Sequence, residues 1–137
     1  MCIRDSVNSF VANVFPGTLG SGLTCVEIGD GYAIARLAYD DANLRPGGIV
    51  PGPSVFGLAD VALWYAVFSR VGLASMAVTS DMTIHFLRPA LGSSLLAKCS
   101  LTKVGKRLAH GEIRVWEEDG DPDRLVAFAS GAYALPD

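Results

Sequence analysis

The stretch SVFGLADVALWYAVFSRV, residues 54–71, decides the fold. Its apolar side chains occupy every face of a helix, which is typical of a helix that is buried on all sides. Gly72 marks its end, and its start is set either by a Ser54 cap or by Pro53 in the first turn. Because such a helix is not stable alone in water, we expect an antiparallel sheet to wrap around it.

Residues on both sides of this helix have strand patterns. We predict six strands, at residues 23–28, 32–39, 76–87, 95–104, 107–117 and 125–135. Strict alternation of polar and apolar residues in the third, fourth and fifth strands is typical of half-buried antiparallel strands. In the third strand it puts Met76, Val78 and Met82 on the apolar face and Thr79 and His85 on the polar face. The last strand is apolar on both faces, which favours a central position or an interface.

A short helix is predicted ahead of the strands, because apolar residues recur at helical spacing over residues 7–15 and Pro16-Gly17 follows them. Residues 1–6 fit no element, so we leave open whether they are native and ordered. A chain of 137 residues without a repeat or a linker fits one domain, residues 1–137, with one core.

The composition excludes several classes of protein. Half of the residues are apolar, 18% are charged and the net charge is −3, which argues against a disordered chain and against a basic nucleic-acid-binding surface. So few charges on a small domain indicate that part of the surface is hidden in an oligomer. Three cysteines without a CxxC pair and only two histidines argue against a disulfide framework and a metal site, and favour a reducing compartment. The longest apolar run is too short to span a membrane, and no secretory signal is visible. We therefore expect a cytoplasmic protein with no membrane partner.

Three strings, in order and at matching spacing, resemble the hotdog-fold acyl-CoA thioesterases, in particular the phenylacetic-acid-pathway family. They are RPGGIVPGPSVFGLADVAL at 45–63, VTSDMTIHFLRPA at 78–90 and GKRLAHGEI at 105–113, and the resemblance covers about residues 7–135. It implies an α+β hotdog fold, in which an antiparallel β-sheet wraps one long buried helix. It also implies a homodimer or homotetramer that hydrolyses acyl-CoA without a metal or cofactor. The active site would lie between two subunits, with the loop before the helix from one and a helix carboxylate from the other.

Asp60 is the first candidate catalytic residue, because it is the only charged residue between Arg45 and Arg70. A carboxylate in apolar surroundings is costly unless it has partners or a function. Thioester hydrolysis needs a carboxylate that activates water or attacks the carbonyl. The family's catalytic acid lies eight residues after a loop glycine, as Asp60 follows Gly52. The Gly52 amide at the helix N-terminus would bind the developing oxyanion. The alternatives are a structural aspartate and an ordinary turn glycine.

The loop before the helix departs from the family pattern. Where the family has His-Gly-Gly, this chain has Pro51-Gly52-Pro53, and where the family has a polar Asn it has Arg45, which we assign to substrate binding. Pro53 offers no N–H group. Thr79 matches a hydroxyl residue that in relatives helps to place the water or substrate, so it is the third catalytic candidate; its alternative is a solvated strand hydroxyl.

A basic stretch suggests how coenzyme A is held. Residues 82–114 contain six Arg and Lys residues and one acid, and such side chains bind phosphate well. The family's CoA contacts match two segments, which here are Phe86, Leu87, Arg88 and Pro89, and Val104, Gly105, Lys106 and Arg107. The alternative is a row of solvated strand charges.

Two other functions remain open at this point. A hotdog dehydratase or hydratase needs a catalytic histidine, but His85 and His110 fall on polar strand faces away from the helix. A non-catalytic module that binds acyl-CoA or lipid would explain the missing loop histidine, whereas the retained Asp60 argues against it.

Overall fold

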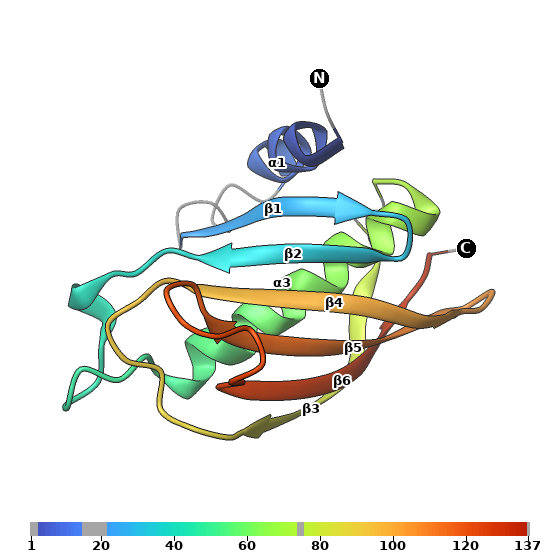
Figure 1. Cartoon of the computed structure of the whole chain (residues 1–137). Coiled ribbons are helices and arrows are strands. Elements are labelled where there is room, and N and C mark those ends of the chain that lie inside the picture. The colour runs from blue at the N-terminus through green and yellow to red at the C-terminus, as the bar shows by residue number, and fades with distance from the viewer. Residues whose placement is uncertain (1–2, 15–21, 74–75, 137) are drawn as a thin grey trace.

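The computed structural model of the chain describes residues 3–14, 22–73 and 76–136 (Figure 1). One antiparallel sheet of six strands, in the order β1-β2-β4-β5-β6-β3, curves around a long helix. The elements are α1 (Ile3–Val14), β1 (Leu23–Gly29), β2 (Tyr32–Leu37), η1 (Asp41–Asn43), α3 (Gly52–Val71), β3 (Val78–Phe86), β4 (Leu95–Val104), β5 (Leu108–Glu117) and β6 (Ala127–Ala134). All six predicted strands are present, and β6 is central between β5 and β3, as its apolar faces indicated.

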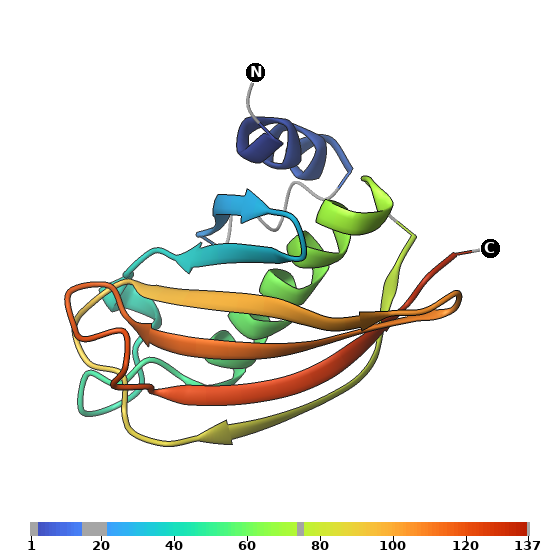
Figure 2. The same ribbon diagram turned by 45° about the vertical axis from the view of Figure 1, so that its right-hand side comes forward.

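Helix α3 crosses the concave face of the sheet, as the turned view shows (Figure 2). Ten of its residues are buried, including Leu63, Tyr65 and Phe68, which confirms the predicted core helix. The prediction of burial on every side is too strong, because Phe56 is 36% exposed and Val71 is 41% exposed. By length and composition alone α3 could cross a membrane, but 56% of its most apolar window is buried inside the fold, as in the core helix of a soluble protein.

Two starts were predicted for helix α3, a Ser54 cap and Pro53 in the first turn, and only the second is found. Pro51 is the N-cap residue, no side chain caps the helix, and the Ser54 amide donates to the Pro51 carbonyl. The Ser54 cap is therefore wrong, whereas Pro53 does lie in the first turn. Pro51 has extended backbone angles, which suit the residue before a helix, and its ring cannot supply a capping oxygen.

The chain before β1 also differs from the prediction. Helix α1 begins at Ile3, so the conclusion that residues 1–6 fit no element is wrong from Ile3 onward. Asn8 of α1 bonds both the amide and the carbonyl of Cys25, which ties the helix to β1. The predicted helix end at Phe15 and Pro16-Gly17 lies outside the described residues, as do Met1 and Cys2.

The pairing of β3 with β6 contains a β-bulge that changes which side chains face α3. Thr79 pairs with Tyr133 and Asp81 pairs with Ala132, so Ser80 is an extra residue in β3. Side chains before the bulge therefore have the opposite phase from those after it. The polar-face assignment of Thr79 and the apolar-face assignment of Val78 are wrong, because Thr79 turns towards α3 and Val78 is 57% exposed.

Candidate active site

Asp60 lies at the centre of a small hydrogen-bonded cluster at the start of β3. Thr79 Oγ1 and Tyr133 Oη both donate to Asp60 Oδ1, each across 2.7 Å. Tyr133 Oη also lies 3.3 Å from the Asp60 carbonyl oxygen. No hydrogen bond to Oδ2 is found among the described residues, and Asp60 is only half-buried. One carboxylate oxygen is thus held in place while the other can accept a proton from water.

Tyr133 is a member of this cluster that the sequence did not indicate. It is buried, and burial, followed by the nearby Asp60 carboxylate, raises the pKa of its hydroxyl far above the ordinary value of 10.0. Tyr133 therefore remains a donor to Asp60 at any ordinary assay pH. The only available signal was a pair of hydroxyl side chains, Ser130 and Tyr133, in a strand predicted to be apolar on both faces.

A second group of predicted residues gathers where β3 ends. A cavity of about 500 Å³ is lined there by Gly52, Arg45, Phe86, Leu87, Arg88 and Pro89, with apolar residues around them. A Cβ atom added at Gly52 would lie 3.5 Å from the Phe86 ring, which places the helix start against the end of β3. The structure thus brings the loop glycine and the first predicted CoA segment into one cavity.

The polar side chains of this cavity are donors. Arg45 and Arg88 line it, and no acidic residue does. Arg88 Nε donates to the Leu125 carbonyl across 2.9 Å. Gly52 is the first residue of α3, and no acceptor for its amide is found in the described parts of the chain. The cavity is therefore suited to an electron-rich group such as a carbonyl oxygen or an anion.

The second predicted CoA segment lies elsewhere in the subunit. Val104, Gly105, Lys106 and Arg107 form the β4–β5 hairpin, which projects at the end of the sheet opposite to residues 40–52 (Figures 1 and 2). Register places Leu108 beside Ala134, and Ala134 beside Val78. The hairpin is thus at the Asp60 end of β3, and a single chain does not bring it to Arg88.

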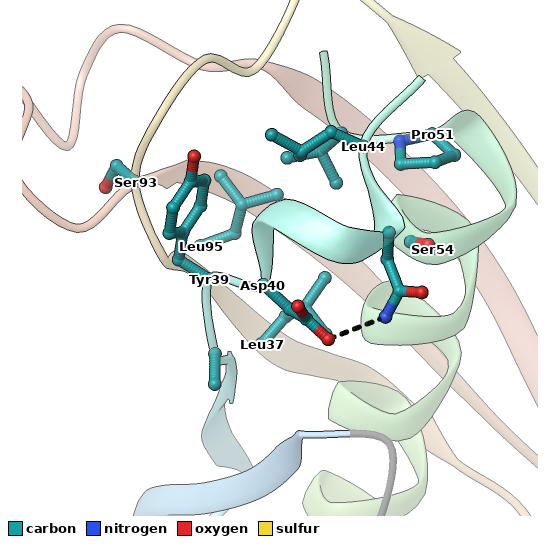
Figure 3. Close-up of a pocket in the computed structure, with 11 residues that line it drawn as sticks. Leu37, Tyr39, Asp40, Leu44, Pro51, Ser54, Ser93 and Leu95 are labelled. Carbon is teal, nitrogen blue, oxygen red and sulfur yellow. Dashed lines mark hydrogen bonds between the residues drawn. The ribbon is translucent and has the colours of Figure 1, made fainter. Parts of the chain in front are cut away.

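A second cavity of about 320 Å³ lies beside the start of α3 (Figure 3). Leu37, Leu44 and Leu95 form its apolar wall, and Tyr39, Asp40 and Ser93 contribute polar groups. The Asp40 carboxylate already accepts from the Ala42 amide and from Asn43, so it holds η1 in shape. None of the predicted site residues lines this cavity.

No histidine or cysteine among the described residues bonds to Asp60 or lines the cavity at Gly52. His85 and His110 are exposed, as predicted for the polar strand faces; Cys25 and Cys99 are buried, and the Cys99 thiol is free. Burial raises the pKa of the Cys99 thiol to about 12, which makes it a poor nucleophile. Within the described ranges, no three His, Cys, Asp or Glu side chains gather as a metal-binding group. The predicted absence of a metal and a cofactor stays a prediction.

Comparison with known proteins identifies the family. The family model described as the thioesterase superfamily matches residues 47–122, more than half of the chain. The chain belongs to the thioesterase superfamily. It is 32% identical over 114 residues to a candidate esterase from Pseudomonas aeruginosa, covering 82% of this chain and 81% of the relative. It is 33% identical over 95 residues to acyl-coenzyme A thioesterase PaaI from Escherichia coli, covering 69% and 66%.

A solved structure agrees with these relatives. The crystal structure of a candidate thioesterase from a Silicibacter species superposes with a TM-score of 0.88 at 32% identity, covering 98% of this chain and 92% of that one. Together the comparisons confirm the predicted hotdog fold, the resemblance to the phenylacetic-acid-pathway family, and a thioester hydrolase rather than a binding module or dehydratase. The roles of individual residues stay predictions.

Proposed function

We propose that this thioesterase hydrolyses an acyl-CoA at two equivalent sites, each shared between two copies of the chain. Asp60 and Gly52 both belong to α3, but eight residues separate them. At about 1.5 Å per residue they lie about 12 Å apart along the helix, which is too far for one thioester group to contact both. A site that uses both residues therefore needs a second subunit.

The placement of β3 supports this proposal, and it is the observation that carries it. β3 forms one edge of the sheet, with Thr79 and the Asp60 cluster at its start and Phe86 and the Gly52 cavity at its end. If the edges of two copies pair antiparallel about a two-fold axis, the start of one β3 lies beside the end of the other. Asp60 of each copy then approaches Gly52 of its partner.

Exposed apolar side chains favour the same assembly. Met76 is 73% exposed and Val78 is 57% exposed at the start of β3, and Phe86 and Leu87 are each 54% exposed at its end. Residues of this kind seldom cluster in water on a monomer. A long, unpaired apolar edge is also an aggregation hazard unless another strand covers it. The dimer is thus the proposed functional unit, and two dimers can form a tetramer.

In this site the chemical roles follow from the contacts. Asp60 accepts the proton of a water through its available Oδ2, while Thr79 and Tyr133 hold the carboxylate in orientation. The Gly52 amide donates to the thioester oxygen, where negative charge develops. The same dimer brings the basic hairpin at Lys106 to the side of the partner's cavity, where it can hold CoA phosphates.

The reaction proposed here needs no metal or cofactor, because carboxylate and backbone donors supply the proton transfer and the charge stabilisation. A cytoplasmic location is proposed with it. Cys99 is a buried, free thiol, which suits a reducing compartment where acyl-CoA is made and used.

A panel of acyl-CoA esters with a thiol-reactive dye tests the activity. Saturable release of CoA from at least one ester is expected from the wild-type protein. Tight binding of acyl-CoA without release would instead favour the binding module. Sedimentation at micromolar concentration tests the assembly, because a folded 14.4 kDa monomer there would contradict the shared site.

A further inference from the structure

The loop before α3 is poor in the donors that an acyl-transfer site needs. An oxyanion hole commonly provides two donors to the carbonyl oxygen as it gains negative charge. In the segment Pro51-Gly52-Pro53, both prolines lack an N–H group, so Gly52 supplies the only amide. The Ser54 and Val55 amides are already bonded to the Pro51 carbonyl. A second donor must come from outside this segment.

Arg45 is the polar side chain of the same cavity that lies closest to Gly52 in the sequence. Its backbone is held in a tight turn, in which the Arg45 amide donates to the Ile49 carbonyl and the Gly48 amide donates to the Arg45 carbonyl. Ile49 is in turn bridged to Leu91, next to the segment that follows β3. The position of Arg45 relative to the cavity is thus set by backbone bonds on both sides of the turn.

The side chain of Arg45 is exposed. It makes no hydrogen bond or ion pair within the described residues, and no acid lines the cavity. The other cation there, Arg88, already uses its Nε on the Leu125 carbonyl. Apolar neighbours such as Val55 and Phe86 line the same cavity, so a bound substrate would displace water and strengthen any charge interaction with Arg45.

We propose that Arg45 is a catalytic residue that donates to the thioester carbonyl oxygen beside the Gly52 amide and replaces the donors that the prolines remove. The inference rests on the proposed function, because it places the thioester at Gly52. A planar guanidinium always carries its charge and offers several donors, so it can follow an oxygen as the carbonyl becomes tetrahedral.

The reaction balances with Arg45 as a charge stabiliser only. The oxygen of the attacking water bonds to the carbonyl carbon and its proton passes to Asp60, while the π electrons of the carbonyl move to the oxygen held by Arg45 and Gly52. When this intermediate collapses, the carbon–sulfur bond breaks and the CoA thiolate takes up the proton from Asp60. Arg45 keeps its own protons throughout.

Coenzyme A phosphates are a less suitable ligand for Arg45. If the thioester oxygen lies at the Gly52 amide, the whole pantetheine arm separates it from the pyrophosphate. Arg45 lines the cavity that contains Gly52, whereas a phosphate-binding cation is expected at the far end of that arm. A free carboxylate on the acyl group is the other chemistry that could reach Arg45, and substrates can separate the two.

Arg45→Ala and Arg45→Lys, assayed on butyryl-CoA and on succinyl-CoA, test the proposal. We expect Arg45→Ala to lower kcat by about 10²-fold on both esters, the usual loss for one oxyanion donor, with KM little changed. Arg45→Lys keeps the charge but lacks the planar guanidinium, so its kcat should lie between those of the wild type and Arg45→Ala. Guanidinium chloride at millimolar concentration should raise kcat of Arg45→Ala, but not that of Asp60→Asn.

Arg114→Ala is the matched control, because it removes the same charge from an exposed position over the Phe128 ring and should keep wild-type kinetics. Three results would overturn the proposal: wild-type kcat in Arg45→Ala, a rise in KM alone that salt abolishes, or a loss confined to succinyl-CoA. The second result would assign Arg45 to CoA phosphate, and the third to an acyl carboxylate. If the wild-type protein hydrolyses no acyl-CoA, the proposed function fails instead, so the two failures are distinguishable.

Discussion

The two ends of β3 present opposite chemistry. At its start, the Asp60 carboxylate is satisfied by the hydroxyls of Thr79 and Tyr133. At its end, the Gly52 amide and the Arg45 guanidinium have no acceptor among the described residues. The carboxylate at the start of β3, which we call the acceptor end, thus has its partners within one chain. The donors at the end of β3, which we call the donor end, have no such partner among the described residues.

This difference indicates which parts are prepared before substrate arrives. A carboxylate that must take a proton benefits from a fixed orientation, and two hydroxyls provide it. Donors for a developing oxyanion do their work only when the substrate oxygen is present. Changes at the first end should therefore alter an existing network, and changes at the second should alter only the substrate complex.

The largest expected effect is at the acceptor end. Asp60→Asn preserves shape but cannot accept the proton, so kcat should fall by about 10²-fold or more with KM little changed. Steady-state kinetics on the best acyl-CoA, together with a thermal melt, measure this. Near-wild-type kcat in a folded Asp60→Asn dimer would mean that Asp60 is not the base.

The next test joins the two ends across subunits. Gly52→Val should fold, since a Cβ there meets Phe86 at an ordinary 3.5 Å, but its bulk blocks the carbonyl from the amide. Co-expression of Asp60→Asn with Gly52→Val chains gives mixed dimers with one intact site and one doubly damaged site. Random pairing should restore about a quarter of wild-type activity.

The same mixture also tests a single-chain site. If Asp60 and Gly52 of one chain worked together, every site in the mixture would carry a lesion. Activity would then stay at the level of the separate variants, and the shared site would be wrong. Differently tagged chains, purified through both tags, provide a pure sample of mixed dimers.

A smaller effect is expected where the phosphate or pantetheine end of CoA binds. Arg88→Ala, or Lys106→Ala combined with Arg107→Ala, should raise KM by about 10-fold and leave kcat nearly unchanged, because contacts with the phosphate or pantetheine end of CoA are equal in ground and transition states. The increase in KM should be smaller in high salt, because salt screens the interaction between the basic side chains and CoA. Wild-type KM in both variants at low salt would mean that these basic residues are solvated and do not bind CoA.

Two buried tyrosines differ in whether the hydroxyl has a hydrogen-bond partner, and the smallest expected effect concerns this difference. The Tyr133 hydroxyl donates to Asp60, whereas the Tyr65 hydroxyl has no partner among the described residues. Tyr133→Phe should lower kcat several-fold and destabilise the fold by about 1–3 kcal/mol, because it removes a hydrogen bond to a charged acceptor. Tyr65→Phe removes an unsatisfied buried hydroxyl, so activity should be unchanged and stability unchanged or higher. Equal changes in kcat and stability in both variants would mean that Tyr133 does not position Asp60.

Alkaline unfolding gives a pH test of the same pair. Burial raises the pKa of both hydroxyls, so above about pH 10 they ionise only in the unfolded chain, which then binds fewer protons than the folded one. The free energy of unfolding should be independent of these groups below pH 10 and fall as the pH rises further, by up to about 1.4 kcal/mol per pH unit for each tyrosine. Urea unfolding at several pH values should show a shallower fall in each Phe variant; an unchanged slope would contradict the burial argument.

Much of this fold could be predicted because alternation and turn residues agree. The strand predicted at residues 95–104 has those bounds in the structure, since Ala97, Cys99 and Leu101 alternate with polar residues and Gly105 follows. Asp60 could be singled out because a lone carboxylate in an apolar helix is costly without partners. These are local patterns, and local patterns are what a sequence displays directly.

The errors arise where distant contacts decide. The phase of Thr79 depends on the unpaired Ser80, and nothing in the alternation from Val78 to Met82 marks a bulge. Tyr133 could not be paired with Asp60, because 73 residues separate them and its strand is apolar on both faces. The Ser54 cap was wrong because a proline at position 51 took the cap position, and both residues suit a helix start.

The bulge at Ser80 makes the length of β3, and not only its composition, a property of the active site. Removing one residue there would restore regular alternation, keep Met82 and Ile84 over the core, and rotate Thr79 away from Asp60 with every functional side chain still present in the gene. A single-codon deletion could thus silence the enzyme as thoroughly as a point mutation. In comparisons of related sequences, a gap at this position therefore has mechanistic meaning even where every aligned letter is identical.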